Sequence, residues 1–266
     1  MTDNNSDKNS DVPLLVAHRG YASRYPENTL PACEAALQAG ACYIEIDIQL
    51  TADAVPVLFH DGNLLRTTGH DALITDINSQ NLRTLDAAER QRLGNAGPFT
   101  PAPTLAEFVG LLKLWPQAQA FIEIKEESLV TFGHQIVLQQ ILDTLEPVQL
   151  QCIPISYDIE ALQGVRDQGS WRIGWVTRDY DEASLEQAQS LAPDYLICNY
   201  RKITTEKLWP GPWQWMLYEV TEAGLAIQLH QRGAQLIETM AIGDLLQNQN
   251  LYSAACQPSE KALDQS

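Results

Sequence analysis

The sequence predicts a single α/β domain folded as a TIM-type (β/α)8 barrel. Its 266 residues, 45% of them hydrophobic, are enough for a full core and match the usual size of one such barrel. Short β-rich runs alternate with helical patterns along the chain, the order expected of βα units around a parallel sheet. We expect the barrel to occupy residues 12–247, with flexible tails at residues 1–11 and 248–266.

Nine runs have the composition of strands, one more than a barrel needs. They are Leu14–Gly20, Tyr43–Leu50, Val55–His60, Phe121–Lys125, Cys152–Ser156, Arg172–Thr177, Tyr195–Tyr200, Trp215–Val220 and Gln235–Met240. Only residues 51–54 separate the second run from the third, which is too short for a crossover between parallel neighbours. We therefore expect the third run to be the return arm of a hairpin that brings His60 to the barrel rim, while the other eight close the barrel.

The helices between these runs carry recognisable start signals. We expect one helix over residues 29–39, which starts at the Pro-Glu-Asn-Thr motif and stops at Gly40. Thr104 with Glu107 forms a potential capping box at the start of a second helix, over residues 104–115. The segment from His60 to the next strand is longer than one loop and one helix require. We expect a small insertion within residues 61–120, on the catalytic face.

Charge, cysteine usage and the absence of long apolar runs indicate which partners and which cellular compartment to expect. A formal net charge of −17 argues against a nucleic-acid partner. The five scattered cysteines, with no CxxC pair, favour free thiols in a reducing compartment over a disulfide framework. Residues 1–11 lack the apolar core of a signal peptide, and no stretch approaches the roughly 18 apolar residues of a membrane span. The sequence thus predicts a cytoplasmic protein without an integral membrane segment, and it indicates no oligomeric state.

Charged residues inside two apolar strands are the main functional signal. Glu45 and Asp47 alternate with isoleucines and so share the face that must point into the barrel, where unpaired charges cost several kcal/mol. Glu123 and Lys125 repeat the pattern. Three inward carboxylates without matching cations predict one divalent cation, Mg²⁺ or Ca²⁺ rather than zinc, because the ligands are all oxygen. The alternative is a buried salt-bridge network of these four residues.

Two histidines stand where strands should reach the same rim. His18, followed by Arg19, ends the first strand run, and His60 ends the hairpin arm. A lone histidine in such a place is more often an ordinary core residue. Together, however, imidazoles that transfer protons near neutral pH, a guanidinium that binds phosphate oxygens and a metal that neutralises charge suit phosphodiester cleavage.

Three segments carry a family resemblance. AHRGYASRYPENT, then GACYIEIDIQLTADAVPVLFHD with Arg66-Thr67-Thr68 behind it, and finally FIEIK resemble the pattern of the glycerophosphodiester phosphodiesterase family, in its cytosolic bacterial form. The resemblance is strong up to Thr68 and at FIEIK, and thin afterwards. It implies a barrel of the phospholipase-C-like phosphodiesterase kind and metal-dependent hydrolysis of small-molecule glycerophosphodiesters to glycerol 3-phosphate and an alcohol.

The resemblance also implies roles for individual residues. The metal ligands would be Glu45, Asp47 and Glu123, the acid/base pair His18 and His60, and the phosphate-binding residues Arg19 and Lys125. Glu27 would orient Arg19 or a substrate hydroxyl, with a simple helix-start residue as the alternative. Asn28 and Asp61 would support the site from behind. The nucleophile would be the glycerol 2-hydroxyl, with a cyclic phosphate as intermediate.

The chain departs from the family pattern at three places. Ala54 stands where the hairpin usually has glycine, Tyr218-Glu219-Val220-Thr221 replaces a Trp-Thr-Val-Asn run, and Ile237-Glu238-Thr239-Met240 replaces a terminal Thr-Asp. Two other functions therefore stay open. One is a glycosidase, since barrels often place two carboxylates on the rim for sugar hydrolysis. The other is a catalytically silent barrel that binds a phosphorylated ligand or a partner protein.

Overall fold

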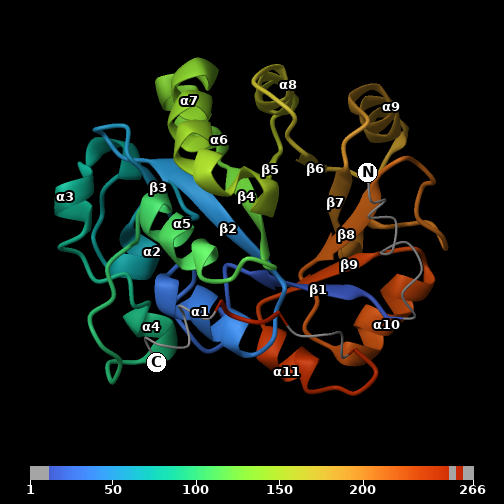
Figure 1. The fold of residues 1–266 in the computed structure, drawn as a ribbon, viewed down its shortest axis with the longest axis horizontal. Helices are drawn as coiled ribbons and strands as arrows, with labels where there is room; N and C mark the ends of the chain where they lie inside the picture. Colours follow the sequence, from blue (N-terminus) through green and yellow to red (C-terminus); the bar gives the residue numbers. More distant parts are fainter. Residues whose placement is uncertain (1–11, 252–255, 260–266) are drawn as a thin grey trace.

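Eight parallel strands form a closed barrel in the computed structural model, which describes residues 12–251 and 256–259. The strands are β1 (Leu14–His18), β2 (Tyr43–Leu50), β4 (Gln119–Ile124), β5 (Cys152–Ser156), β6 (Gly174–Val176), β7 (Tyr195–Asn199), β8 (Gln214–Tyr218) and β9 (Leu236–Thr239). Their order is β1-β9-β8-β7-β6-β5-β4-β2, and β1 also pairs with β2, which closes the sheet (Figure 1). The predicted TIM-type barrel is confirmed.

The ninth run is the return arm of a hairpin, as its short connection predicted. β3 (Pro56–Leu58) pairs antiparallel with β2, with Leu58 opposite Ile48. Ala54 takes the left-handed backbone conformation of the turn, with a φ of 55°. The Thr51 hydroxyl and carbonyl hold this turn through contacts with Asp53 and with the Ala54 amide. Ala54 thus occupies, at a steric cost, a conformation that glycine adopts freely.

Helices surround the barrel, and the two with predicted caps begin as expected. α1 (Leu30–Gln38) starts after Thr29, whose hydroxyl accepts from Ala32 N, and α5 (Leu105–Lys113) starts with the Thr104–Glu107 capping box. The others that follow strands are α6 (Glu126–Phe132), α7 (His134–Leu145), α8 (Ile159–Asp167), α9 (Glu182–Leu191), α10 (Ala223–Gln231) and α11 (Ile242–Leu246), with short 3₁₀ turns η3 (Glu146–Gln151) and η4 (Tyr200–Lys202). Within the described residues, no helix is long and apolar enough to cross a membrane.

The predicted insertion lies between β3 and α5. It contains α2 (Leu65–Thr68), η2 (Ile74–Asp76), α3 (Ser79–Leu82) and α4 (Arg90–Leu93). Its apolar side chains form a small core of their own with the hairpin, which includes Leu64, Ile74 and Leu82. This packing gives the insertion a fixed place beside the barrel and allows its charged residues to reach the site.

The strand alternation divides the apolar residues into two layers. Ile44, Ile46 and Ile48 of β2 pack outward among the helices, in the largest buried cluster. A separate cluster that includes Val16, Phe121 and Ile153 fills the barrel interior. The isoleucine pattern of β2 therefore identified the outward face correctly, and its acidic residues occupy the inward face.

The three tryptophans near β8 pack the loop before that strand. Trp213 and Trp215 are buried, and Trp209 stacks on Tyr180 with ring centroids 3.8 Å apart. The Trp215 indole donates to the Trp209 carbonyl. These contacts fit a packing role for the tryptophan cluster.

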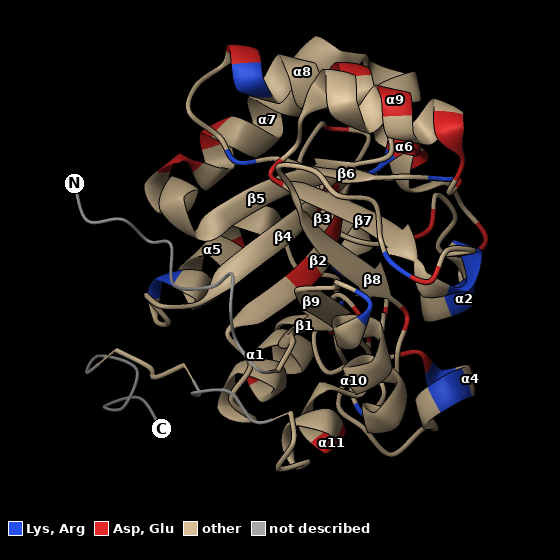
Figure 2. Cartoon of the chain, turned by 90° about the vertical axis from the view of Figure 1, so that its right-hand side faces the viewer, with Lys and Arg blue, Asp and Glu red and all other residues tan. Residues whose placement is uncertain are grey.

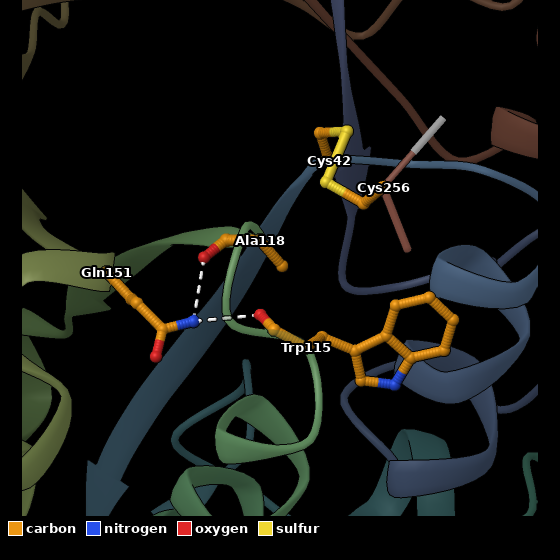
Figure 3. Close-up of a disulfide and its surroundings, with 5 residues drawn as sticks. All are labelled: Cys42, Trp115, Ala118, Gln151 and Cys256. Atoms are coloured by element: carbon orange, nitrogen blue, oxygen red, sulfur yellow. Dashed lines mark hydrogen bonds between the residues drawn. A yellow bond between two sulfur atoms is a disulfide. The ribbon is translucent and has the colours of Figure 1, made fainter. Parts of the chain in front are cut away.

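Two of the five cysteines form a disulfide, so the prediction of free thiols is wrong for them. Cys42, just before β2, is bonded to Cys256, 214 residues away (Figure 3). Nearby, the Gln151 side-chain amide donates to the Trp115 and Ala118 carbonyls. Cys33, Cys152 and Cys198 are free and buried. The sequence did not reveal this pair, because the spacing of the cysteines does not show which of them lie close together in the fold.

The C-terminal segment is also more closely attached than the sequence suggested. Leu251 is fully buried, Cys256 is held by its disulfide, and the Ser259 amide donates to the Leu114 carbonyl. The expectation of a flexible tail from residue 248 is therefore wrong for these described positions. Residues 1–11, 252–255 and 260–266, also predicted to be flexible, lie outside the described residues.

Candidate active site

The end of β1 turns sharply and directs Arg19 into the barrel mouth. Arg19 and Gly20 both have positive φ angles, 56° and 78°. A Cβ at Gly20 would lie only 2.6 Å from the Ala32 carbonyl carbon, so glycine is needed there for both conformation and space. The Asn28 amide donates to the Arg19 carbonyl and connects this turn to the start of α1.

Three carboxylates meet in the barrel mouth, where the two strand patterns predicted them. Glu45 and Asp47 of β2 are each 1% exposed, and Asp47 is paired in register with Glu123 of β4. One oxygen from each of the three lies within 4.8 Å of the others. Glu45 Oε1 is buried and has no hydrogen-bond partner among the described residues, so it is available to a cation. Figure 2 shows acidic positions along β2.

The charges in this cluster are unevenly compensated. Burial would raise the pKa of Asp47, but Arg19, Lys125 and the Asn28 side chain hold it well below its usual value. For Glu45, burial and the charges of Asp47 and Glu238 raise the pKa well above its usual value. Burial and Asp47 likewise raise the pKa of Glu123. The cluster therefore lacks positive charge, which a divalent cation would supply.

Lys125 and Arg19 stand beside these carboxylates. Lys125 Nζ donates to Glu123 Oε1 at 2.8 Å and lies 3.3 Å from Asp47 Oδ1, while Arg19 Nε lies 3.1 Å from Asp47 Oδ2. Burial would lower the pKa of both cations, but the surrounding carboxylates raise it. Both side chains stay charged and line the same pocket, where they can bind an anion.

Glu27 connects Arg19 to the insertion. Arg19 Nη1 donates to Glu27 Oε1 at 2.9 Å, and Arg66 of α2 donates to both Glu27 oxygens at 2.7 and 2.9 Å. Burial would raise the pKa of Glu27, but the Arg66 hydrogen bonds and the charge of Arg19 lower it. Glu27 thus contacts both Arg19 and Arg66, which fits the expectation that it orients Arg19. The basic segments of α2 and α4 lie on this side of the barrel (Figure 2).

His60 is supported by its sequence neighbour. Its Nδ1 donates to Asp61 Oδ1 at 2.6 Å, and Arg66 donates to both oxygens of Asp61 at 2.6 and 3.0 Å. Burial would raise the pKa of Asp61, but its hydrogen bonds to His60 and Arg66 lower it. The hairpin therefore delivers His60 to the site, and the insertion fixes the carboxylate behind it.

His18 is supported from the far end of the chain. Its Nδ1 contacts Glu219 Oε2, and its Nε2 lies 3.8 Å from Glu45 Oε2. Burial would lower the pKa of His18, but the charge of Glu238 and the hydrogen bond to Glu219 raise it above its usual value. Burial, with nearby Glu219 and Glu123, raises the pKa of Glu238 to about 7.

A pocket of about 190 Å³ opens between the two histidines. Its walls include Arg19, Lys125 and Glu123 on one side, and Tyr157, Tyr218 and Glu238 elsewhere. The Tyr157 and Tyr218 hydroxyls are 2.8 Å apart and hydrogen-bonded to each other. The pocket is lined by proton-transfer groups and two cations and lies beside a carboxylate cluster. These are the groups needed to bind and cleave a phosphate ester.

The fold brings together every residue that the sequence singled out for the site. Those residues are His18, Arg19, Glu27, Glu45, Asp47, His60, Glu123 and Lys125. Sequence reasoning missed the parts played by Arg66, Glu219 and Glu238. A signal was present for Glu238, which, like Glu45, is a charged residue within an apolar strand run.

The comparison with known proteins identifies the family. Residues 18–188, more than half of the chain, match the model of the glycerophosphoryl diester phosphodiesterase family. The chain belongs to this family. The match starts at His18 and includes the hairpin, the carboxylate cluster and Lys125.

Individual relatives of the glycerophosphoryl diester phosphodiesterase family match shorter stretches. The chain is 42% identical to glycerophosphodiester phosphodiesterase 1 of Bos taurus over 102 residues. The aligned stretch covers 38% of this chain and 31% of that protein. It is 31% identical to a glycerophosphodiester phosphodiesterase of Bacillus altitudinis over 137 residues. This alignment covers 52% of this chain and 54% of that protein. These alignments thus span from about a third to about half of the curated relatives.

Solved structures resemble the chain along most of its length. A glycerophosphoryl diester phosphodiesterase structure from Silicibacter pomeroyi has a TM-score of 0.77 at 20% identity and covers 89% of this chain and 92% of that one. A phosphodiesterase from Oleispira antarctica, solved with the product sn-glycerol-3-phosphate, has a TM-score of 0.76 at 22% identity, with 89% and 96% coverage. At these identities the likeness shows the fold.

Proposed function

We propose that this protein is a metal-dependent glycerophosphodiester phosphodiesterase, which hydrolyses glycerophosphodiesters to glycerol 3-phosphate and an alcohol. One observation carries the proposal: His18, His60, Arg19, Lys125 and Glu123 line one pocket. Family membership supports the reaction class. The Oleispira antarctica structure with bound sn-glycerol-3-phosphate supports the product, because the two folds superimpose over most of the chain.

The metal ligands would be Glu45, Asp47 and Glu123. The cluster suits a hard divalent cation, Mg²⁺ or Ca²⁺, because all its ligands are oxygen and because buried Glu45 Oε1 has no partner in the described part of the chain. When bound, such an ion neutralises charge on the phosphoryl oxygens. In the alternative salt-bridge network, Lys125 and Arg19 would balance the three carboxylates, but both cations approach Asp47 and leave Glu45 with a raised pKa.

The chain's own residues would perform the binding and the proton transfers. Arg19 and Lys125 have further N–H donors available for the phosphate oxygens. Each histidine has its Nδ1 bonded to a carboxylate, so the proton would be exchanged at Nε2. One histidine would deprotonate the glycerol 2-hydroxyl as its oxygen bonds to phosphorus, and the other would protonate the alkoxide whose bond to phosphorus breaks. Water would then attack the resulting cyclic phosphate, and the two histidines would exchange protons in the reverse direction as the bond between phosphorus and the 2-oxygen breaks, which gives glycerol 3-phosphate. Glu27 would keep Arg19 in place during these steps.

The test measures glycerol 3-phosphate released from glycerophosphocholine and glycerophosphoethanolamine by purified protein, first with EDTA and then with Mg²⁺ or Ca²⁺. We expect release only with metal, and a loss of about 100-fold or more in His18→Ala and His60→Ala. His134→Ala is the matched control, since His134 pairs with Asp158 away from the pocket. Undiminished turnover in both site variants would refute the acid/base roles.

The same assay, run in parallel with glycosides as substrates, separates the alternatives. A folded protein that releases nothing under any condition would favour the silent barrel, whereas hydrolysis of glycosides would favour the glycosidase. Arg19 and Lys125 have no part in sugar hydrolysis, which favours the phosphodiesterase. The cytoplasmic location stays a prediction, and with Cys42 bonded to Cys256 the cysteine usage no longer supports it.

A further inference from the structure

Glu219 makes two directed contacts through its two carboxylate oxygens. Oε2 contacts His18 Nδ1, and Oε1 accepts a hydrogen bond from the Met240 amide at 2.7 Å. His18 ends β1, Glu219 directly follows β8, and Met240 directly follows β9. Since β8, β9 and β1 are neighbours in the barrel, the glutamate spans three adjacent strand ends. Its position is therefore fixed by the sheet itself.

These contacts determine where the proton of a neutral His18 lies. A carboxylate only accepts hydrogen bonds, so Nδ1 must carry the proton that it donates to Glu219. The lone pair is then on Nε2, the nitrogen that faces Glu45 and the carboxylate cluster. Glu238 and Arg19 also face this imidazole, but they act on it through their charge. Glu45 Oε2 lies 3.8 Å from Nε2, beyond hydrogen-bond distance, so among the described contacts of this ring the Glu219 contact is the one that selects Nδ1 for the proton.

We propose that Glu219 is a positioning residue, which fixes the tautomer and the ring orientation of His18 so that Nε2 exchanges the proton during catalysis. The inference rests on the proposed function and adds a residue from the segment where the family resemblance is thin. There the family usually has Trp-Thr-Val-Asn, whereas this chain has Tyr218-Glu219-Val220-Thr221. Asp61 holds Nδ1 of His60 in the same way, although its own support comes from the insertion.

The substitution Glu219→Gln tests the proposal because it keeps the shape and reverses the hydrogen bond. The single amide oxygen remains the acceptor for the Met240 amide, so the NH₂ group faces His18 Nδ1. Nδ1 must then accept, and the proton moves to Nε2. We expect kcat to fall about 100-fold or more, as when an orienting carboxylate is lost from a histidine, with KM within about threefold.

Glu222→Gln is the matched control. Glu222 and Glu219 line the same surface pocket beside Tyr200, and among the described residues the carboxylate that contacts His18 Nδ1 is that of Glu219. This variant loses the same charge from the same rim, so a general electrostatic effect would appear in both. We expect its kcat and KM to equal those of the original protein. Equal losses in the two variants would refute a specific role for Glu219.

A second measurement reads the tautomer directly and needs no turnover. Nitrogen NMR of protein labelled with ¹⁵N-histidine, at alkaline pH where the imidazole is neutral, distinguishes protonated from unprotonated ring nitrogens. The His18 signals are assigned by their loss in His18→Ala. We expect Nδ1–H in the original protein and in Glu222→Gln, and Nε2–H in Glu219→Gln.

The two readouts separate failure of this inference from failure of the proposed function. An inactive original protein with the expected tautomers would overturn the function and leave the positioning intact. A Glu219→Gln protein that keeps both the Nδ1–H tautomer and an unchanged kcat would overturn the positioning role. Thermal unfolding of each variant shows that the comparison is made between folded proteins.

Discussion

Replacing Arg66 with alanine should destabilise the protein and weaken the site together. Arg66 donates two hydrogen bonds to Glu27 and two to Asp61, and it lies 3.6 Å from Glu89. The Glu27 side chain is only 6% exposed, so without Arg66 it keeps a buried charge with Arg19 as its remaining cationic partner. The Arg66 side chain is itself 43% exposed, so solvent screening reduces the about 3–5 kcal/mol of a fully buried pair, and we expect a cost of about 2 kcal/mol.

The cost should depend on pH with a defined sign. The pKa of Glu27 is lowered in the folded protein, so this group stabilises the fold above the usual glutamate pKa of 4.5, and the contribution is lost as pH falls through the lower folded value. Without Arg66, its hydrogen bonds and charge no longer lower the pKa of Glu27 while burial still acts to raise it, so protonation is easier and relieves the variant. The difference in the free energy of unfolding between the two proteins should therefore be largest near neutral pH and shrink below pH 4.5.

Urea unfolding at a series of pH values measures this difference. Arg83→Ala is the control, because Arg83 of the same insertion pairs with Glu107 while both side chains are more than a third exposed. Such a surface pair should contribute less than about 1 kcal/mol. An Arg66→Ala variant that loses no more stability than Arg83→Ala, or whose loss is the same at every pH, would refute the reasoning. We also expect a lower kcat, because Arg66 supports both His60 and Arg19 through their carboxylates.

Three further predictions concern the backbone and the disulfide. Reducing the Cys42–Cys256 bond should lower the free energy of unfolding by about 2–4 kcal/mol, measured in urea with and without reductant, while the double serine variant should not respond to reductant. Ala54→Gly should raise the unfolding free energy by about 1 kcal/mol, because it relieves a φ of 55°; an unchanged midpoint would contradict this. Gly20→Ala should unfold well below the original temperature, since the added Cβ would meet the Ala32 backbone at 2.6 Å; calorimetry showing equal stability would argue against this close approach.

Local patterns predicted the features that depend on neighbours in sequence. The alternation of charge and isoleucine in β2 placed Glu45 and Asp47 inside the barrel, because side chains on a strand alternate between faces whatever the rest of the chain does. The length of residues 51–54 identified the hairpin for a similar reason, since a parallel crossover needs more chain. Two of the proposed metal ligands and the hairpin that carries His60 followed from these two facts.

Features that depend on barrel closure could not be predicted in this way. His18 and Glu219 are 201 residues apart, and Cys42 and Cys256 are separated by 214. Each pair meets only because β1 lies beside the last strands or because the C-terminal segment returns to the start of β2. Arg66 belongs to a segment that resembles the family pattern, but its contacts require the insertion to be docked against the barrel. No single stretch of sequence contains that information.

The contact between His18 and Glu219 has a consequence for how the protein acquires activity during synthesis. The carboxylate cluster, His60 and Lys125 all come from the first half of the chain, whereas the partner of His18 follows β8 and is held by an amide that follows β9. A nascent chain that has not yet delivered β9 therefore contains all the proposed metal ligands but lacks the support that we propose for His18. Catalytic competence would arrive only when the last strand closes the barrel, so an incomplete chain would remain inactive towards cellular phosphodiesters.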